Sequence, residues 1–538
     1  MLRKNDPTKQ TTLFDATLWM DNRALSRLEK TWAPIFYEEI FMKIDEAPFA
    51  VLYSNTGSPN FPVNILLSLE YIKHMKNYSD AELLEDYDFD FLVNYAVGNR
   101  RLGERPMAER TLYNFRERLY NYCVQNPKSD DILFGQFEKL TRNFADKAGV
   151  SMIDQRVDTT MFMSNIKKAG RISLAYDVLI KAVKAVPEDK RTDDLSKALE
   201  PGFKTDILYR SKGEDRDSRL TTLLNLCKEA ADILEKLTEA DEDVKRILNR
   251  FIEDQAMQNQ DGTVVPKNKR DIKSTSLQSA FDETATFRKK AGIGQSGYVL
   301  EIAETCGKEN DFQLITDYRV EQNVVSDTAI ITSRIGGISD RTGCENMYGD
   351  GGFYSPEVIE AAGKAGVEMH FTDMTGTSPS KKLPVSEYEV EEKTRIITKC
   401  PAGYKPDMAA ISKGQSVAHF PCTVCEGCEM KDHCRVKFQK KSAVVRISLK
   451  SFEVDNVRAS IINGKRENTS MRAGIEGSNS AMKRKGLRKL DVRGIEKSSV
   501  VCGLKAAAQN ISRFIRFCKG GYKKKENPNI NTGEVCLN

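Results

Sequence analysis

The segment "MRAGIEGSNSAMKRKGLRKLDVRG", residues 471–494, is the most informative stretch for the fold. It is strongly basic and carries one carboxylate, Glu476, near its start. Arg472 precedes Glu476 by four residues, and Lys483 follows it by seven. At about 100° per residue, both steps return to nearly the same side of an α-helix. The spacing predicts a helix with Arg, Glu and Lys in line on one face. The ordinary alternative is a solvated helix in which Arg472 and Glu476 form an ion pair.

The cations around Glu476 are suited to holding phosphates, because guanidinium and ammonium groups form charge-assisted hydrogen bonds with phosphate oxygens. Gly474 and Gly477 weaken the same helix by roughly 0.5–1 kcal/mol each. That cost is easier to understand if a backbone or a DNA strand approaches closely there. We expect four residues to bind DNA phosphates: Arg472, Lys483, Lys485 and Arg488.

The composition describes a globular chain whose charge is unevenly distributed. Of the 538 residues, 40% are hydrophobic and 30% are charged, and the formal net charge is only +5. This length allows roughly two to four domains or one elaborated core. Between Lys465 and Lys525, however, Lys and Arg greatly outnumber Asp and Glu. Such a basic end predicts a polyanionic partner, most simply nucleic acid.

The sequence favours a cytoplasmic protein without a membrane partner. No apolar run approaches the length of a membrane span. The first residues, "MLRKNDPTKQTTLFD", lack the apolar core of a signal peptide. In the cytoplasm, the twelve cysteines are poor candidates for disulfides.

Five cysteines crowd into one short region, which favours metal binding. The segment "CTVCEGCEMKDHC" contains four of them: Cys422, Cys425, Cys428 and Cys434. Four thiolates at this spacing suit tetrahedral Zn²⁺, and Cys400 or His433 could replace one ligand. An iron–sulfur cluster and reduced free thiols are the alternatives. The isolated His74 and His370 are expected to be structural.

The first 150 residues have helical periodicity. Ser79 and Glu82 lie at capping-box spacing at the start of one predicted helix. The last helix of this group, "AERTLYNFRERLYNYCVQ", carries Leu112, Phe115 and Leu119 on one face and arginines elsewhere. Short helices of this kind resemble a small DNA-binding bundle. A helical cap with solvated charges is the alternative.

Strand and helix patterns alternate in the rest of the chain. Residues from about 172 to 260 are amphipathic helices, and "QDGTVVPKNKRD" closes them as a polar loop. Six stretches have strand character: "VSMIDQRVDTTMFMSNI", "SGYVLEIAET", "FQLITDYRV", "CENMYGDGGF", "GVEMHFTDM" and "SAVVRISLKSF". The order predicts an α/β fold with a central mixed sheet flanked by helices.

Three carboxylates are candidates for a metal site. Asp158 lies in an apolar strand, where an unpaired carboxylate is costly. Asp350 lies at a strand end before a glycine pair, in a position where active sites collect. Together with Glu476 they could bind Mg²⁺ for phosphodiester cleavage. Each also has an ordinary interpretation, the two aspartates as turn residues and Glu476 as a partner of Arg472.

These motifs resemble those of bacterial insertion-sequence transposases of the DDE class. "RVDTTMFMSN" resembles the first-Asp strand, and "MYGDGGFYSPEVI" resembles the second-Asp motif. "RAGIEGSNSAMKRKGLRKLDVRGIEK" resembles the Glu helix with its signature Tyr-x2-Arg-x3-Glu-x6-Lys. The helical segments after Phe61 resemble the N-terminal domain of the family. The chain departs from the pattern at Thr469, which stands where the signature has Tyr, and at Phe353, where Tyr is usual after Gly.

The resemblance implies a ribonuclease H-like mixed sheet flanked by helices, with an N-terminal helical bundle and a helical insertion. It implies a cut-and-paste DNA transposase in which Asp158, Asp350 and Glu476 bind two Mg²⁺ or Mn²⁺ ions for endonuclease cleavage and strand transfer. The implied partners are double-stranded DNA with terminal inverted repeats, a target DNA, and a second copy of the chain in a homodimer. The implied location is the bacterial cytoplasm, in association with the nucleoid.

The expected domains follow the order of these motifs. They are an N-terminal helical DNA-binding domain, the first core strand, a helical insertion, the remaining core strands, a Cys-rich zinc-binding insertion, and the Glu helix with basic C-terminal helices. Their bounds are 1–150, 151–171, 172–270, 271–385, 386–460 and 461–538.

Two other functions compete with transposition. The first is a non-catalytic DNA-binding protein derived from a transposase, for which Thr469 leaves room. The second is a ribonuclease H-like nuclease that only cleaves. The N-terminal bundle favours transposition over simple cleavage, because recognition of DNA ends requires sequence reading.

Overall fold

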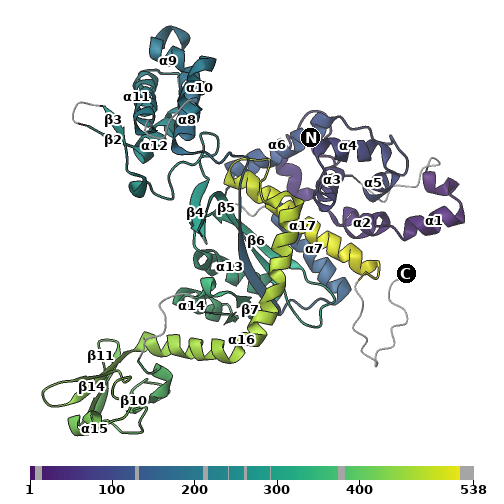
Figure 1. Ribbon diagram of the computed structural model, residues 1–538. Helices are drawn as coiled ribbons and strands as arrows, with labels where there is room; N and C mark the ends of the chain where they lie inside the picture. Colours follow the sequence, from purple (N-terminus) through teal and green to yellow (C-terminus); the bar gives the residue numbers. More distant parts are fainter. Residues whose placement is uncertain are drawn as a thin grey trace. The chain divides into compact units, whose positions relative to one another are not determined.

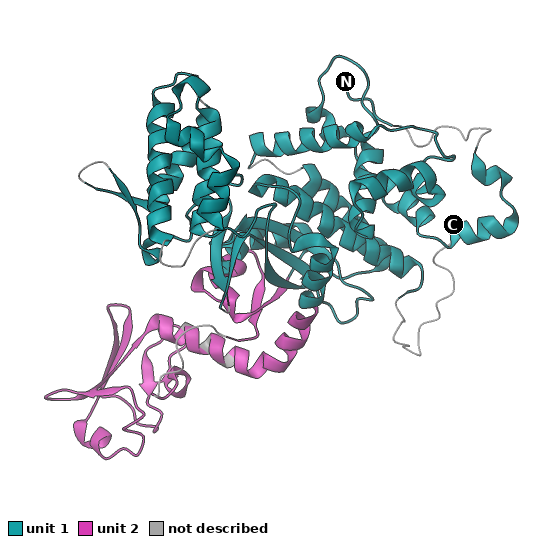
Figure 2. Cartoon of the chain, turned by 45° about the horizontal axis from the view of Figure 1, so that its top comes forward, with its two compact units in different colours: residues 1–344, 475–538 teal, residues 345–474 magenta. Residues whose placement is uncertain are grey.

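The structure, a computed structural model, describes residues 1–5, 15–127, 132–209, 216–239, 241–259, 263–290, 292–373 and 382–521. The chain divides into two compact units, coloured separately in Figure 2. Unit 1 contains Met1–Cys344 and Ile475–Asn538, and unit 2 contains Glu345–Gly474. The boundary between Gly474 and Ile475 lies inside one long helix, α16 (Leu449–Met482).

Unit 1 begins with helices, as the periodicity predicts. Their bounds are α1 (Asn22–Glu29), α2 (Ala33–Glu39), α3 (Val63–Lys76), α4 (Asp80–Phe89), α5 (Phe91–Ala96), α6 (Glu109–Gln125) and α7 (Ile132–Ala148). The predicted capping box opens α4. The Glu82 N–H donates to Ser79 Oγ at 3.2 Å, and the Ser79 N–H donates to Glu82 Oε2 at 2.7 Å. These two bonds satisfy backbone donors that have no partner within the helix.

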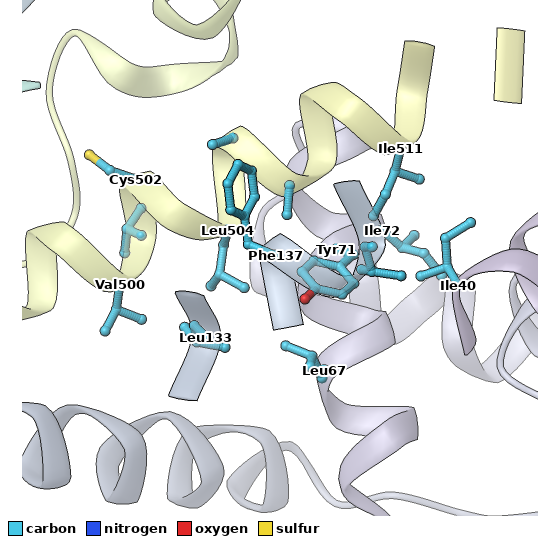
Figure 3. Close-up of a cluster of buried hydrophobic side chains, with 14 of the residues drawn as sticks. Ile40, Leu67, Tyr71, Ile72, Leu133, Phe137, Val500, Cys502, Leu504 and Ile511 are labelled. Carbon is cyan, nitrogen blue, oxygen red and sulfur yellow. The ribbon is translucent and has the colours of Figure 1, made fainter. Parts of the chain in front are cut away.

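The last helix, α17 (Ile495–Cys518), lies at the centre of unit 1 and is buried almost all round. It packs against α3, α6, α7 and the strand β6 (Ile315–Gln322). Figure 3 shows side chains of α17, such as Leu504 and Ile511, beside Leu67 and Tyr71 of α3. The predicted inward face of α6 belongs to the same core. The N-terminal helices therefore share one apolar core with the strands.

The sheet of unit 1 is built around the long strand β5 (Ile293–Thr305). One edge of β5 pairs antiparallel with β1 (Asp154–Phe162), and the other pairs antiparallel with β6. The first residues of β5 pair with β4 (Thr286–Lys290). Helix α13 (Asp327–Thr342) follows β6 and packs against it (Figure 1).

The helical insertion forms a bundle with its own apolar core. Its elements are α8 (Arg171–Ala185), α9 (Asp193–Ala198), α10 (Pro201–Leu208), α11 (Arg216–Glu235), α12 (Glu242–Gln255), β2 (Ala256–Gln258) and β3 (Val264–Pro266). The prediction of a plain polar loop after the helices was wrong at β3, which pairs with β2 in a hairpin. The Arg171 guanidinium donates to the Lys267 carbonyl at 2.9 Å and to Gln255 Oε1 at 2.8 Å. Arg171 thus ties the entry of the bundle to its exit.

Unit 2 contains the two other predicted core strands and the Cys-rich segment. Strands β7 (Asn346–Gly349) and β8 (Glu368–Phe371) are parallel and are connected through α14 (Pro356–Lys364). The Cys-rich segment has its own small core. Its elements are β9 (Glu389–Val390), β10 (Ile397–Lys399), β11 (Met408–Ser412), β12 (Gln415–Phe420), α15 (Cys422–Glu426), β13 (Val436–Phe438) and β14 (Ala443–Ser448).

The architecture is mixed α/β, with antiparallel strands in unit 1 and a parallel pair in unit 2, as the sequence predicts. The specific ribonuclease H-like arrangement stays a prediction. Across the described ranges, no helix is both long enough and apolar enough to cross a membrane.

The close contact between α17 and β6 gives a testable prediction. A Cβ at Gly503 would overlap the Tyr318 hydroxyl, so Gly503→Ala should lower the free energy of unfolding by about 1–3 kcal/mol. Gly477→Ala in α16 is the matched control, because its Cβ would meet no described atom within 4 Å. That change should raise the free energy of unfolding by about 0.5–1 kcal/mol. Denaturant unfolding measures both, and equal effects would contradict the packing of α17.

Candidate active site

Asp158 lies in the middle of β1, opposite Ile302 of β5. Its strand neighbour Val157 is fully buried, whereas Asp158 itself is half-buried. Alternation along a strand points successive side chains to opposite faces, so Val157 packs into the core and Asp158 faces the other side. The carboxylate therefore keeps partial access to solvent or a ligand, although the surrounding sequence is apolar.

Asn479 of α16 contacts Asp158. Its Nδ2 donates a hydrogen bond to Asp158 Oδ2 at 2.9 Å. Asn479 is only 6% exposed, and its Oδ1 is buried without a hydrogen-bond partner among the described residues. A buried amide oxygen of this kind is an additional oxygen donor beside the carboxylate. The sequence analysis missed Asn479, although it follows Glu476 by only three residues, less than one helical turn.

Lys483 also lies within electrostatic reach of Asp158. Burial lowers the pKa of Lys483, Arg488 lowers it further, and Asp158 acts in the opposite direction. The helix changes character at this position, because α16 ends at Met482 and a π-helical turn spans Lys483–Leu487. The backbone leaves helical geometry at Lys485 and Gly486, so the expectation that the basic segment is one helix through residue 494 was wrong.

A buried ion cluster around Glu304 of β5 fixes the elements that carry Asp158 and Asn479. Glu304 is fully buried. Its carboxylate accepts hydrogen bonds from Arg156 Nε at 3.1 Å and from Arg513 Nη1 at 3.0 Å. The Ser478 hydroxyl also donates to it. Arg156 lies two residues before Asp158, and Ser478 lies directly before Asn479, so the cluster positions both site residues.

The cluster also determines the charge of Glu304. Burial acts to raise the pKa of the carboxyl, but the two arginines and the Ser478 hydroxyl outweigh it and hold the pKa below its ordinary value of 4.5. Glu304 is therefore ionised at neutral pH, and its negative charge compensates the buried guanidinium group of Arg156 and the partly buried one of Arg513.

Asp350 lies in unit 2, directly after β7. Its Oδ1 accepts a hydrogen bond from the Gly352 N–H at 2.8 Å and caps the short 3-10 helix η7 (Gly351–Phe353). Its Oδ2 lies 3.6 Å from Nη2 of Arg472 on α16. Asp350 is therefore a turn residue, as its ordinary interpretation predicts. Arg472, the arginine of the signature, contacts Asp350 within unit 2.

Glu476 lies on the exposed side of α16, in the part of the helix that belongs to unit 1. The three predicted carboxylates thus belong to two units, Asp158 and Glu476 to unit 1 and Asp350 to unit 2. Across the described ranges, no three His, Cys, Asp or Glu side chains are grouped so that they could hold a metal ion. The convergence of the three carboxylates stays a prediction, as do the phosphate-binding roles of Arg472, Lys483, Lys485 and Arg488.

The cysteine segment forms a separate feature of unit 2. Four thiols line one small cavity of about 20 Å³: Cys400, Cys425, Cys428 and Cys434. Burial, and to a smaller extent the neighbouring thiols, raise the pKa of Cys425 to about 11. The predicted ligand Cys422 does not line this cavity, and neither does His433. The thiols are gathered, but they are not grouped as a metal-ligand set, and the structure itself gives no support to zinc.

Two family models match the chain. The model described as "Transposase DDE domain" matches residues 399–515, and the model described as "Transposase domain (DUF772)" matches residues 26–118. No curated protein and no solved structure matches it. The first range includes the Cys-rich segment and the Glu helix, and the second includes most of the N-terminal helices.

The two matches confirm the resemblance: the chain carries domains of DDE-type insertion-sequence transposases. A DDE transposase domain implies nuclease and transposition activity in general, and DNA as the partner. Neither matched range contains Asp158 or Asp350, so the comparisons do not test these two residues.

The Glu304 cluster predicts a pH-dependent loss of stability. Glu304→Gln leaves Arg156 and Arg513 without their counter-charge and should lower the free energy of unfolding by about 3–5 kcal/mol at neutral pH. Because the folded-state pKa is depressed, this stabilisation is present above pH 4.5 and is lost as pH falls through the folded pKa. Denaturant unfolding at several pH values should show the difference between wild type and variant shrinking in acid.

A surface pair provides the control for this measurement. Glu321 lies 2.7 Å from Arg319 in an exposed ion pair on β6, so Glu321→Gln should cost less than about 1 kcal/mol. A Glu304→Gln effect as small as that of Glu321→Gln would show that the cluster does not hold the strands and helices together.

Proposed function

We propose that this transposase cleaves the ends of its insertion sequence and joins them to a target DNA by a cut-and-paste route, with Asp158, Asp350 and Glu476 as the catalytic carboxylates. The observation that carries the proposal is the hydrogen bond from Asn479 of the Glu helix to Asp158. It supports the prediction that the first-Asp strand and the Glu helix act at one site.

The side chains of this chain would divide the work. Asn479 orients the Asp158 carboxylate through a hydrogen bond. The buried Oδ1 of Asn479 is a further oxygen donor beside this carboxylate. Arg472, beside Asp350, and Lys483, within reach of Asp158, are placed to hold DNA phosphates. Lys485 and Arg488 extend this basic surface along the turn that follows the Glu helix.

The oxygen donors of Asp158, Asp350, Glu476 and Asn479 fit Mg²⁺ or Mn²⁺, which prefer carboxylate and carbonyl ligands over thiolates. When bound, two such ions supply an activated water and stabilise the leaving oxygen of a phosphodiester. We further propose that the protein acts as a homodimer on DNA with terminal inverted repeats, and that it resides in the bacterial cytoplasm at the nucleoid.

A non-catalytic DNA-binding protein is the second candidate, and one observation favours it. Thr469, at the position of the signature Tyr, donates its hydroxyl to the Lys465 carbonyl of its own helix at 2.7 Å. The Thr469 hydroxyl therefore lies against its own helix and cannot extend as far from it as the hydroxyl of a tyrosine would. Wild-type protein that binds end DNA but never cleaves it would support this candidate.

Cleavage of end DNA tests the catalytic assignment. The substrate is the DNA that flanks the gene, which includes the ends of the element. Asp158→Asn, Asp350→Asn and Glu476→Gln should each reduce cleavage by roughly 10³-fold or more, because the carboxylates act as a unit. DNA binding, measured by fluorescence anisotropy in parallel, should remain.

The matched control is Glu467→Gln on the same helix. Glu467 precedes Glu476 by nine residues, a rotation of about 900° that places it on the opposite face of α16. This variant should cleave DNA at nearly the wild-type rate. Near-normal cleavage by any of the three site variants would remove that residue from the active site.

We also propose a structural zinc ion in the cysteine segment, because closely spaced cysteines such as Cys425 and Cys428 suit tetrahedral Zn²⁺. Elemental analysis of the purified protein should find about one zinc per chain, and Cys425→Ser and Cys428→Ser should lose it. Cys422→Ser is the control and should retain zinc, because Cys422 does not line the cavity. Protein without zinc, or equal loss in the Cys422 variant, would contradict this ligand set.

A further inference from the structure

A lysine is buried in α17, the last helix of unit 1. Lys505 of α17 is only 9% exposed. Its ammonium group donates to the Lys485 carbonyl at 2.6 Å and lies 3.5 Å from Nδ1 of His74. Among the described residues, no carboxylate forms an ion pair with it. A buried ammonium group without a counter-charge is costly, so its presence calls for an anionic partner.

The Lys505 side chain reaches an open pocket of about 400 Å³. The polar side chains that line this pocket include Lys73, His74, Asn77, Lys489, Asp491 and Lys505. Lys73 already pairs with Asp80 at 2.8 Å, and Asp491 is the only carboxylate in the lining. The pocket therefore has an excess of positive charge around a buried cation.

Without an outside anion, the surroundings of Lys505 disfavour its charged form, because burial and the charges of Lys73 and Lys485 lower the pKa of Lys505. Burial lowers the pKa of His74 well below its ordinary value, and the charges of Lys505, Lys73 and Arg116 lower it further. A neutral His74 can accept the hydrogen bond of the Lys505 ammonium group, whereas a protonated one could not. His74 thus supports Lys505 as a hydrogen-bond acceptor.

Gly486 keeps the mouth of the pocket open. It adopts a left-handed conformation with φ of +84°, which favours glycine. A Cβ at this position would lie 3.5 Å from the Lys505 Nζ and 3.7 Å from Asn77 Oδ1. A side chain there would occupy the space in front of the ammonium group. The turn that contains Gly486 begins at Lys483, so the pocket adjoins the basic end of the Glu helix.

We propose that this pocket binds a phosphate group of the DNA backbone, with Lys505 as the buried cation and Lys489 at the rim. The proposal rests on DNA as the partner under the proposed function. A phosphodiester supplies the negative charge that Lys505 lacks, and the volume exceeds that of a phosphate group alone. A strand held along the Glu helix would be anchored here beyond the catalytic carboxylates.

The salt dependence of DNA binding tests the proposal on the full-length protein. Anisotropy titrations with the flanking duplex over a range of chloride concentrations give the slope of log affinity against log salt. Lys505→Met should reduce the slope by about 0.9, the value for one lost phosphate contact. Lys489→Met should reduce it in the same direction and provides a second variant if Lys505→Met does not fold. Lys236→Met, an exposed lysine of the insertion bundle, should leave the slope unchanged.

Inorganic phosphate separates the two sources of the anion. If phosphate raises the melting temperature of wild type but not of Lys505→Met, while the DNA slopes remain equal, the pocket serves free phosphate and the proposal is overturned. Unchanged slopes for both pocket variants without a phosphate effect overturn it as well. A reduced slope in protein that never cleaves DNA would overturn the proposed catalysis and leave the phosphate pocket standing.

Discussion

The buried ionised Glu304 is the interaction on which the candidate site depends. Its partners come from β1 (Arg156), from α16 (Ser478) and from α17 (Arg513). Arg156 lies two residues before Asp158 and Ser478 lies directly before Asn479, so the position of one buried carboxylate affects both site residues. The hydrogen bond between Asp158 and Asn479 joins residues close in sequence to Arg156 and Ser478, which bind Glu304. A buried ion pair is weak evidence for stability, but a charge shared by three elements allows only one arrangement of them.

The elements of the fold could be predicted where their signals are local. Strand β1 and helix α17 follow from apolar periodicity, and the Ser79–Glu82 capping box follows from spacing alone. The Glu304 cluster could not be predicted in the same way. Its bonds join residues separated by 148, 174 and 209 positions in the chain. In the sequence, Glu304 is one more polar residue near the end of a strand, and no pattern shows that two arginines meet there.

The candidate site was predictable in part. Motif resemblance singled out Asp158, Asp350 and Glu476, because each motif is a short run of neighbouring residues. Asn479 was missed because an asparagine on a basic helix looks like an ordinary surface residue, and only its burial shows its role. The break in the helical backbone at Lys485 and Gly486 was missed as well, although Gly486 carried the signal. Glycine just after a helical run is the usual residue for a left-handed turn.

Among the polar residues buried in α17, a comparison of Asn510 with Lys505 shows why Lys505 differs from a structural polar group. The Asn510 side chain bonds both backbone groups of Ile315, at 2.8 and 2.7 Å, and the Thr141 hydroxyl at 3.0 Å. Its hydrogen-bonding capacity is therefore met inside the fold, and burial costs it little. Lys505 has acceptors for its protons, but its charge has no counter-charge among the described residues. Hydrogen bonds satisfy the donors of an ammonium group without neutralising it. A folded chain that keeps such a charge in place has left room for an anion from outside.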